Sequence, residues 1–333
     1  MAPTLLSPAP LITIEEARAL GTRVHSPAYR RVRPGIYIEG RVWESLAGWQ
    51  RYQVRVQAFT RAHPDAILCL ESAAVVHDLP LFGHPRDIHV YDPDRAASRR
   101  FGDVAVHTSA DGRAVQLVAG IAVTDVADTV VDLARILPPA HALAVADAAV
   151  SPAQGGSLDV DELRGRASTQ CTRRGRARLE LLWPMIDSRS ESPGESISRA
   201  VILWSGLEAP ELQREFRYEG ALDRVDFFFA SVGVIGESDG WGKYGLDDPA
   251  GAQQRLREEK RREDRLRRHG HAFALGLRRR RPRRAAAPRP AARRGSCGAP
   301  AATRAPRDAA PQPALTSSRT VRNHIRREKP RLA

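Results

Sequence analysis

The spacing of apolar residues changes several times along the first 150 positions. Some segments place an apolar residue every three or four positions, as one face of a helix requires. Others alternate apolar and polar residues or form a short apolar run, as strands do. The helix-type segments are residues 43–62, 124–137 and 141–150, and the strand-type segments are residues 66–70, 87–92 and 103–109. This mixture predicts a compact α/β unit over residues 41–150.

Residues 1–40 have the outline of a small winged helix. Thr13 is suited to cap a helix whose first turn holds two acids, and Gly21 can end that helix. Ser26, which is followed by proline, offers a second helix start. A basic segment then leads through a Pro-Gly pair into a short strand at residues 36–38, which predicts a β-wing.

Three arginines stand on the predicted wing: Arg30, Arg31 and Arg33. Arginines at such a position are suited to bind DNA phosphates. The same three residues also fit an ordinary solvated turn, and the sequence favours neither interpretation.

The second half of the chain begins with residues 151–191, which are polar and contain a basic helix-type segment, so we expect a helical connector. After it the pattern predicts a helix, three strands, a charged helix and a last strand. The helix is expected at residues 195–205, the three strands at 212–218, 224–229 and 232–239, and the charged helix at 252–269. The last strand begins at residue 271.

Ionisable residues gather in the otherwise apolar strands of residues 221–245. They are Asp226, Glu237, Asp239 and Lys243. A hairpin turn centred after Ser231 would place Asp226 directly opposite Glu237 on one face of the sheet, with Cβ atoms about 5 Å apart. A slip of one residue would break this pairing.

Carboxylates this close repel one another, so at least one pKa rises unless a cation lies between them. A hard divalent ion, Mg²⁺ or Mn²⁺, meets that need through oxygen ligands from Asp226, Glu237 and Asp239. The alternative is a solvated sheet face with scattered acids. Glu195 also has two explanations, because Ser192 and Glu195 form a helix-capping box that requires no catalytic role.

Four motifs appear in order over residues 192–273: E-S-x-S-R, V-D-F, G-E-x-D-G-x-x-K-Y and E-K-R-R-E-D-x-L-R. This order resembles very-short-patch-repair (Vsr)-like endonucleases of the PD-(D/E)xK superfamily. The resemblance implies a restriction-endonuclease-like αβββαβ core, with Asp226 and Glu237 as metal ligands and Glu195 supporting them. Asp239 stands where the family usually has a lysine, so Lys243 is the expected replacement from the following loop.

The first half carries a second resemblance. The segments R-R-V-R-P-G-I-Y-I, E-S-A-A-V-V-H-D-L-P-L-F-G and G-I-A-V-T-D-V-A-D-T-V-V-D-L-A-R resemble the AbiEi-like antitoxins of type IV toxin–antitoxin systems. The resemblance implies promoter binding through the winged helix and a cognate toxin as a possible partner.

The net charge of +13 is distributed unevenly. Of the chain's 52 Lys/Arg and 39 Asp/Glu, residues 271–333 contain 17 and 2, which leaves 35 and 37 for residues 1–270. The basic charge is therefore no evidence that the folded domains bind DNA. Residues 277–333 lack any apolar period, which predicts a disordered segment. It is either a basic nucleic-acid-binding tail or the product of a shifted reading frame, and the abrupt loss of pattern favours the second.

The remaining composition narrows the class of protein. The three cysteines are far apart, so we expect neither disulfides nor a zinc site. We therefore expect the protein to be in the reducing cytoplasm. The sequence has no apolar run of about 18 residues and no basic leader, so we expect no membrane span and no signal peptide. The histidines His77, His89 and His107 lack metal-ligand spacing, and we expect them to be structural or surface residues.

Together these patterns predict an α/β protein of mixed α+β type. The predicted function is a DNA-associated protein with an AbiEi-like antitoxin region and a Vsr-like nuclease domain that hydrolyses DNA phosphodiesters with Mg²⁺. The alternative is a non-catalytic DNA-binding antitoxin or transcriptional repressor whose nuclease-like domain only binds.

Overall fold

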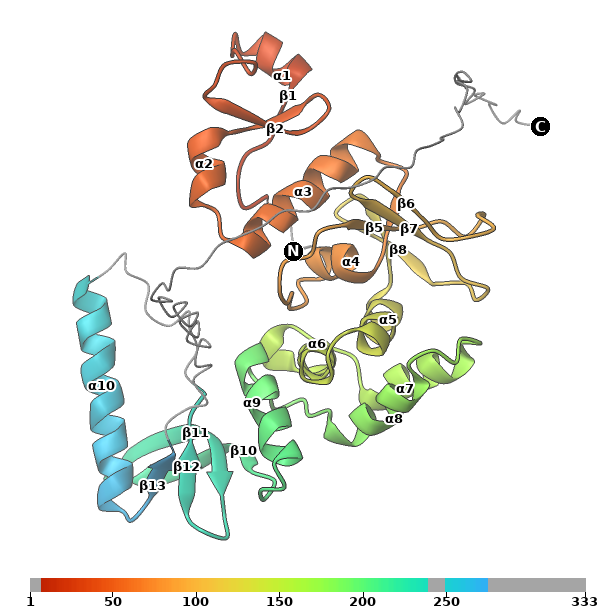
Figure 1. Ribbon diagram of the computed structural model, residues 1–333. Helices are drawn as coiled ribbons and strands as arrows, with labels where there is room; N and C mark the ends of the chain where they lie inside the picture. The colour runs from red at the N-terminus through yellow and green to blue at the C-terminus, as the bar shows by residue number, and fades with distance from the viewer. Residues whose placement is uncertain (1–6, 239–248, 275–333) are drawn as a thin grey trace, which may run out of the picture. The chain divides into compact units, whose positions relative to one another are not determined.

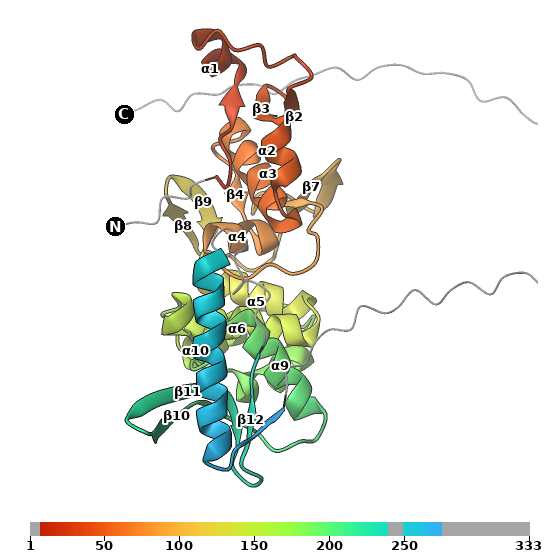
Figure 2. The same ribbon diagram turned by 90° about the vertical axis from the view of Figure 1, so that its left-hand side faces the viewer.

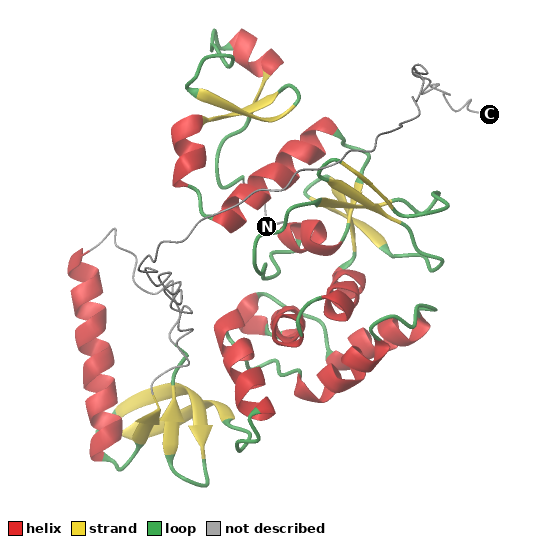
Figure 3. Cartoon of the chain, viewed as in Figure 1, coloured by secondary structure: helices red, strands yellow, loops and turns green. Residues whose placement is uncertain are grey.

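The computed structural model of this 333-residue chain describes residues 7–238 and 249–274 (Figure 1). Asp239, Lys243 and the tail predicted over residues 277–333 lie outside these ranges. Within them the chain mixes helices with three separate sheets, as Figure 3 shows, which confirms the predicted α/β class. None of the described helices is long and apolar enough to span a membrane.

The N-terminal sheet has three strands in the order β1-β3-β2, namely β1 (Ile12–Thr13), β3 (Ile36–Glu39) and β2 (Tyr29–Arg33). Helix α1 (Ile14–Ala19) follows β1, and Thr13 and Glu16 form a reciprocal capping box at its start. The predicted β-wing is the antiparallel β2–β3 hairpin, whose Gly35 has a φ of 78°, a conformation that glycine adopts without strain.

The helix start predicted at Ser26 is wrong. The backbone there forms successive turns, with Ser26 N donating to Arg23 O and Tyr29 N donating to Ser26 O. Tyr29 already pairs with Glu39 in the hairpin, so the chain must be extended directly after the turn.

The helix-type segment at residues 43–62 forms two helices, α2 (Gly40–Ser45) and α3 (Gly48–Ala62). They separate at Leu46, whose backbone is extended and whose side chain is buried. Leu46 packs in one core with residues of both the N-terminal sheet and α3, so the apolar core continues across the boundary expected at residue 40.

The central sheet has six strands in the order β6-β7-β5-β4-β9-β8. The strands are β4 (Ile67–Leu68), β5 (Ile88–Tyr91), β6 (Arg99–Phe101), β7 (Val104–His107), β8 (Val115–Val118) and β9 (Ile121–Thr124). Strand β5 runs parallel to β7, and β4 runs parallel to β9. Side chains of α3 and of α4 (Leu70–Val76) share a buried cluster with this sheet.

A group of helices with one apolar core follows the central sheet. They are α5 (Val126–Ile136), α6 (Pro139–Val150), α7 (Val160–Thr169), α8 (Arg176–Leu182) and α9 (Pro193–Trp204), with short 3₁₀ helices at Pro152–Gln154 and Trp183–Met185. Leu163, Leu179 and Trp183 are buried in this core, so the segment expected to be a connector is part of the packed structure.

The C-terminal sheet contains β10 (Glu211–Tyr218), β11 (Ala221–Phe229), β12 (Val234–Gly236) and β13 (Ala272–Ala274), in that order. Helix α10 (Pro249–Arg268) connects β12 to the parallel β13. Figures 1 and 2 show α10 lying across this sheet, and its Leu266 is buried against Val225 and Ile235. From α9 to β13 the elements follow the predicted order of helix, three strands, helix and strand.

Candidate functional site

Glu195 lies in the first turn of α9, and its residue is only 6% exposed. Its carboxylate accepts hydrogen bonds from the backbone N of Glu191 (2.9 Å), the hydroxyl of Ser192 (2.8 Å) and the side-chain amide of Gln213 (2.9 Å). Ser192 caps the helix by accepting from Glu195 N at 3.2 Å, but the predicted capping box is incomplete, because the Glu195 carboxylate accepts from the backbone N of Glu191 and not of Ser192. The Gln213 contact goes beyond capping, because it connects this helix end to strand β10.

Asp226 and Glu237 lie on neighbouring strands in the register that the sequence predicted. The β11–β12 ladder pairs Phe227 with Gly236, and the next position in that register places Asp226 opposite Glu237. The Asp226 carboxylate accepts a hydrogen bond from the backbone N of Ser238 at 2.7 Å, which holds the end of β12 against β11. The hairpin therefore brings two carboxylates to one end of the sheet.

Burial raises the pKa of Glu195 above its ordinary value, and the negative charge of Asp226 acts in the same direction. The hydrogen bonds that Glu195 accepts oppose only part of this rise. Asp226 therefore lies close enough for its charge to act on Glu195, although the two residues are 31 positions apart in the sequence.

Gln213 is one of two residues of this site, with Arg262, that the sequence did not reveal. Its φ is +53°, a left-handed conformation that is unusual for a residue other than glycine in the middle of a strand. The flanking pairs of the β10–β11 ladder leave Gln213 opposite Asp226. Strained backbone of this kind is concentrated at functional sites. Its side chain contacts Glu195, so one residue lies beside both carboxyl groups.

Arg262 of α10 provides a positive charge at the site. Its guanidinium Nη2 lies 3.0 Å from Oε1 of Glu237, and both side chains are mostly buried, with 24% and 20% exposed. The same guanidinium donates to the backbone O of Arg224 at 2.9 Å. The ion pair offsets part of the repulsion between the carboxylates.

The donor chemistry fits a hard divalent cation, because Asp226, Glu237 and Glu195 offer carboxylate oxygens. Within residues 7–238 and 249–274, however, no group of three or more His, Cys, Asp and Glu side chains is arranged to hold a metal ion. The third predicted ligand, Asp239, and the predicted catalytic Lys243 lie outside those ranges.

The three arginines of the wing differ in their environment. Arg30 and Arg31 are exposed, and the Arg30 guanidinium lies 5.0 Å from the centre of the Trp43 ring. Arg33 instead forms a bidentate ion pair with Asp103, at 2.7 and 2.9 Å. Its guanidinium therefore has a partner within the chain, and the structure gives Arg33 a structural role.

Asp103 also binds Arg55, at 2.9 Å. Partial burial raises the pKa of Asp103, but the hydrogen bonds and charges of Arg33 and Arg55 outweigh this effect and hold that pKa below its ordinary value. The shared carboxylate connects the wing and α3 to the loop before β7.

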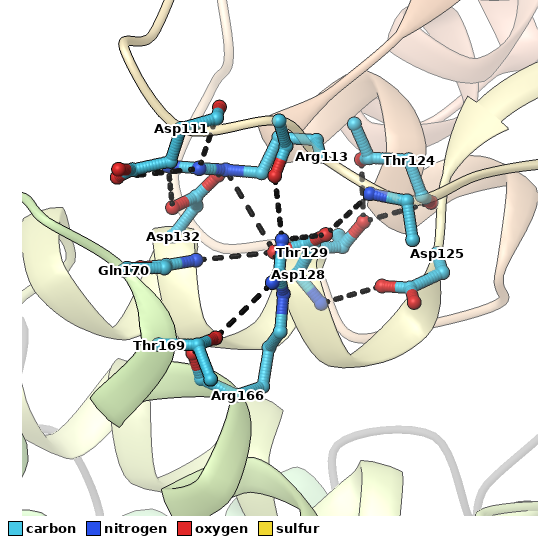
Figure 4. A network of polar contacts seen from close by, with 12 residues as sticks. Asp111, Arg113, Thr124, Asp125, Asp128, Thr129, Asp132, Arg166, Thr169 and Gln170 are labelled. Carbon is cyan, nitrogen blue, oxygen red and sulfur yellow. Dashed lines mark hydrogen bonds and ion pairs between the residues drawn. The ribbon is translucent and has the colours of Figure 1, made fainter.

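A second polar network connects α5 and α7 (Figure 4). Asp128 is fully buried, and it accepts hydrogen bonds from Arg166 at 2.6 and 2.9 Å, from Gln170 at 3.1 Å and from the backbone N of Ala114 at 2.8 Å. These contacts satisfy a buried charge, as a structural ion pair requires. Asp125 caps α5 by accepting from Asp128 N at 2.7 Å, and the preceding Thr124 hydroxyl is hydrogen-bonded to Thr129.

Comparison with known proteins finds no matching protein-family model. Two curated proteins of Mycobacterium tuberculosis are similar to the chain: "Uncharacterized protein Rv2248" of strain H37Rv and "Uncharacterized protein MT2308" of strain CDC 1551. Each is 31% identical over 201 residues, which cover 59% of this chain and 69% of the relative.

Proposed function

Because the chain belongs to the same family as Rv2248 and MT2308, whose names assign no activity, we propose its function from its own residues. The proposal is a DNA-associated protein whose C-terminal domain, β10–β13 with α9 and α10, hydrolyses DNA phosphodiesters with Mg²⁺ or Mn²⁺. The observation that carries it is the opposed pair of Asp226 and Glu237 beside the buried Glu195. The resemblance to Vsr-like endonucleases supports the same assignment.

In this proposal Asp226 and Glu237 hold the divalent ion, with Asp239 as a third ligand. A bound divalent ion supplies an activated water and stabilises the negative charge that develops on the phosphate. Lys243 would help to orient the attacking water or to stabilise the negative charge that develops on the phosphate. Glu195 acts as a positioning residue: its three hydrogen bonds fix its carboxylate beside Asp226, and Gln213 ties that arrangement to β10.

Nicking of supercoiled plasmid in Mg²⁺ tests the proposal with the full chain. We expect the wild type to nick and the double variant Asp226→Ala with Glu237→Ala to lose nicking. Glu215→Ala is the matched control, because Glu215 is an exposed carboxylate on β10 of the same sheet. Equal nicking by wild type and double variant, or nicking by neither, would contradict the enzymatic proposal.

The Arg262–Glu237 ion pair favours a second candidate. A guanidinium already balances one of the carboxylates, so the acidic group is stable without a metal ion. A cytoplasmic DNA-binding antitoxin or repressor, with a cognate toxin as partner and a nuclease-like domain that only binds, is consistent with this arrangement. Arg30 and Arg31 are then its exposed phosphate contacts.

The salt dependence of promoter binding tests this second candidate. Removing two phosphate contacts, with Arg30→Ala and Arg31→Ala, should reduce the slope of log K against log salt by about 1.8, since each contact contributes about 0.9. Arg164→Ala removes an exposed arginine of α7 and should leave the slope unchanged. An unchanged slope in the double variant would show that the wing does not contact DNA.

A further inference from the structure

Two side chains of the central sheet and one of helix α4 form a line of titratable groups that the proposed nuclease does not use. His89 on β5 and His107 on β7 approach within 2.8 Å, through Nδ1 of His89 and Nε2 of His107. The other ring nitrogen of His89, Nε2, lies 3.4 Å from Oε2 of Glu71, in the first turn of α4. Glu71, His89 and His107 therefore form a chain in which the two rings share a hydrogen bond and Glu71 lies within ion-pair distance of His89.

This chain ends at a cavity of about 210 Å³ that His107 lines. The cavity lies where the parallel strands β5 and β7 end, because Tyr91 and His107 are their paired last residues and both line it. Crevices at the carboxyl ends of parallel strands are common ligand sites. His89 engages Nε2 of His107, a residue that lines the cavity, so Nδ1 is the other ring nitrogen of that residue.

The charged side chains that line the cavity are mainly cationic. They are Arg113, Arg135, Arg174 and Asp132. Arg113 is fixed by a bidentate pair with Asp132, at 2.8 and 3.1 Å, and Figure 4 shows this pair next to the Asp128 network. Arg135 is fixed by Gln170 at 3.0 and 3.2 Å and by the backbone O of Arg174 at 2.9 Å. Rigid guanidiniums are pre-organised to bind oxyanions.

A strained backbone position adjoins the chain. Leu70, which also lines the cavity, has a φ of +49° and immediately precedes Glu71. This conformation is unfavourable for a bulky residue and persists only where the surrounding structure enforces it. Here it sets the position from which Glu71 faces His89.

Burial lowers the pKa values of both His89 and His107 and raises the pKa of Glu71. The charged groups acting on these histidines are Glu71, Asp87, Asp132 and Arg100. With both rings neutral and His107 donating through Nε2 to Nδ1 of His89, Nδ1 of His107 is an acceptor. One proton taken from solvent converts Nδ1 into a donor on a residue that lines the cavity.

We propose that this cavity binds the phosphate or carboxylate group of a small molecule, and that binding is coupled to uptake of one proton by the Glu71–His89–His107 chain. An anion beside His107 stabilises the protonated ring, so binding strengthens as the pH falls. The inference does not depend on the nuclease proposal, because none of the residues that carry it belongs to the acidic site.

Calorimetric titration of the full chain tests the proposal with sulfate, as a non-titrating stand-in for phosphate, and with acetate. Affinity should rise by up to about tenfold per pH unit as the pH falls below the ordinary histidine pKa of about 6.5, because burial lowers the pKa of His107 in the free protein. Buffers with different ionisation enthalpies should report uptake of about one proton. Stronger binding of sulfate would indicate a phosphate ligand, and stronger binding of acetate a carboxylate ligand.

Two variants separate the proton chain from the anion contact. His107→Asn should abolish the pH dependence and the proton uptake, whereas His84→Asn, at an exposed histidine, should change neither. Arg174→Ala, at an exposed residue, should weaken binding at every pH without changing the proton count. The proposal is overturned if the wild type binds neither ion at millimolar concentrations, or if His107→Asn binds with unchanged pH dependence.

Discussion

The left-handed conformation of Gln213 predicts which of two substitutions at this position leaves the protein more stable. Gln213→Ala removes the hydrogen bond to Glu195 and keeps the backbone strain at a φ of +53°. Loss of a hydrogen bond to a charged group costs about 1.5–3 kcal/mol, so we expect the free energy of unfolding to fall by about 2 kcal/mol. Gln213→Gly loses the same bond but relieves the strain.

The expected relief follows from two opposing effects. A left-handed residue other than glycine costs about 1–2 kcal/mol. Glycine also has greater conformational entropy in the unfolded chain, which cancels about 0.4–1 kcal/mol of the stability gained by relieving the strain. Gln213→Gly should therefore be about 0.5–1 kcal/mol more stable than Gln213→Ala. Both variants should lose nicking activity to the same extent, because both release Glu195.

Urea unfolding of the two variants measures this difference. Ala119, at a φ of +50° in the turn between β8 and β9, provides the control, since Ala119→Gly changes the backbone freedom without removing a side-chain hydrogen bond and should stabilise the chain. If Gln213→Gly is as unstable as Gln213→Ala while Ala119→Gly is stabilised, the strain assigned to Gln213 is wrong. If Gln213→Ala costs nothing, the contact with Glu195 has no energetic role.

Two further predictions concern the same site. Arg262→Gln removes the guanidinium beside Glu237, so it should tighten Mn²⁺ binding in titration calorimetry. Unchanged or weaker Mn²⁺ binding would mean that Arg262 does not compete with a metal ion. The pKa of Glu195 is raised in the folded chain, so Glu195 keeps its proton there at pH values at which the unfolded chain has released it. The free energy of unfolding should therefore fall as the pH rises from the ordinary carboxyl range through the raised pKa of Glu195. In urea unfolding at several pH values, Glu195→Gln should make the free energy of unfolding less dependent on pH, whereas Glu215→Gln should not. The same pH dependence in wild type and Glu195→Gln would refute the raised pKa of Glu195.

The sequence predicts best what is determined locally. The cap that Thr13 places on the first helix depends on adjacent residues, and the structure has it. The register of the β11–β12 hairpin follows from strand alternation and a short turn, and it was predicted to the residue. The split of the helix at Leu46 was missed because both halves keep helical spacing and the buried position of Leu46 depends on the N-terminal sheet.

Long-range partners were beyond reach. Asp103 lies 70 positions after Arg33, and no local pattern shows that the two form an ion pair. Gln213 has an ordinary neighbourhood in the sequence, and no local pattern indicates its unusual φ or its hydrogen bond to Glu195. His89 and His107 lack metal-ligand spacing, yet parallel pairing of their strands brings them into contact.

The most direct test of the central claim is the Mg²⁺ dependence of plasmid nicking by the wild type and by Asp226→Ala with Glu237→Ala. The account predicts nicking that rises with Mg²⁺ and disappears with chelator in the wild type and in Glu215→Ala, and none in the double variant. Nicking by the double variant at the wild-type rate, or no nicking by the wild type at any Mg²⁺ concentration, would contradict it.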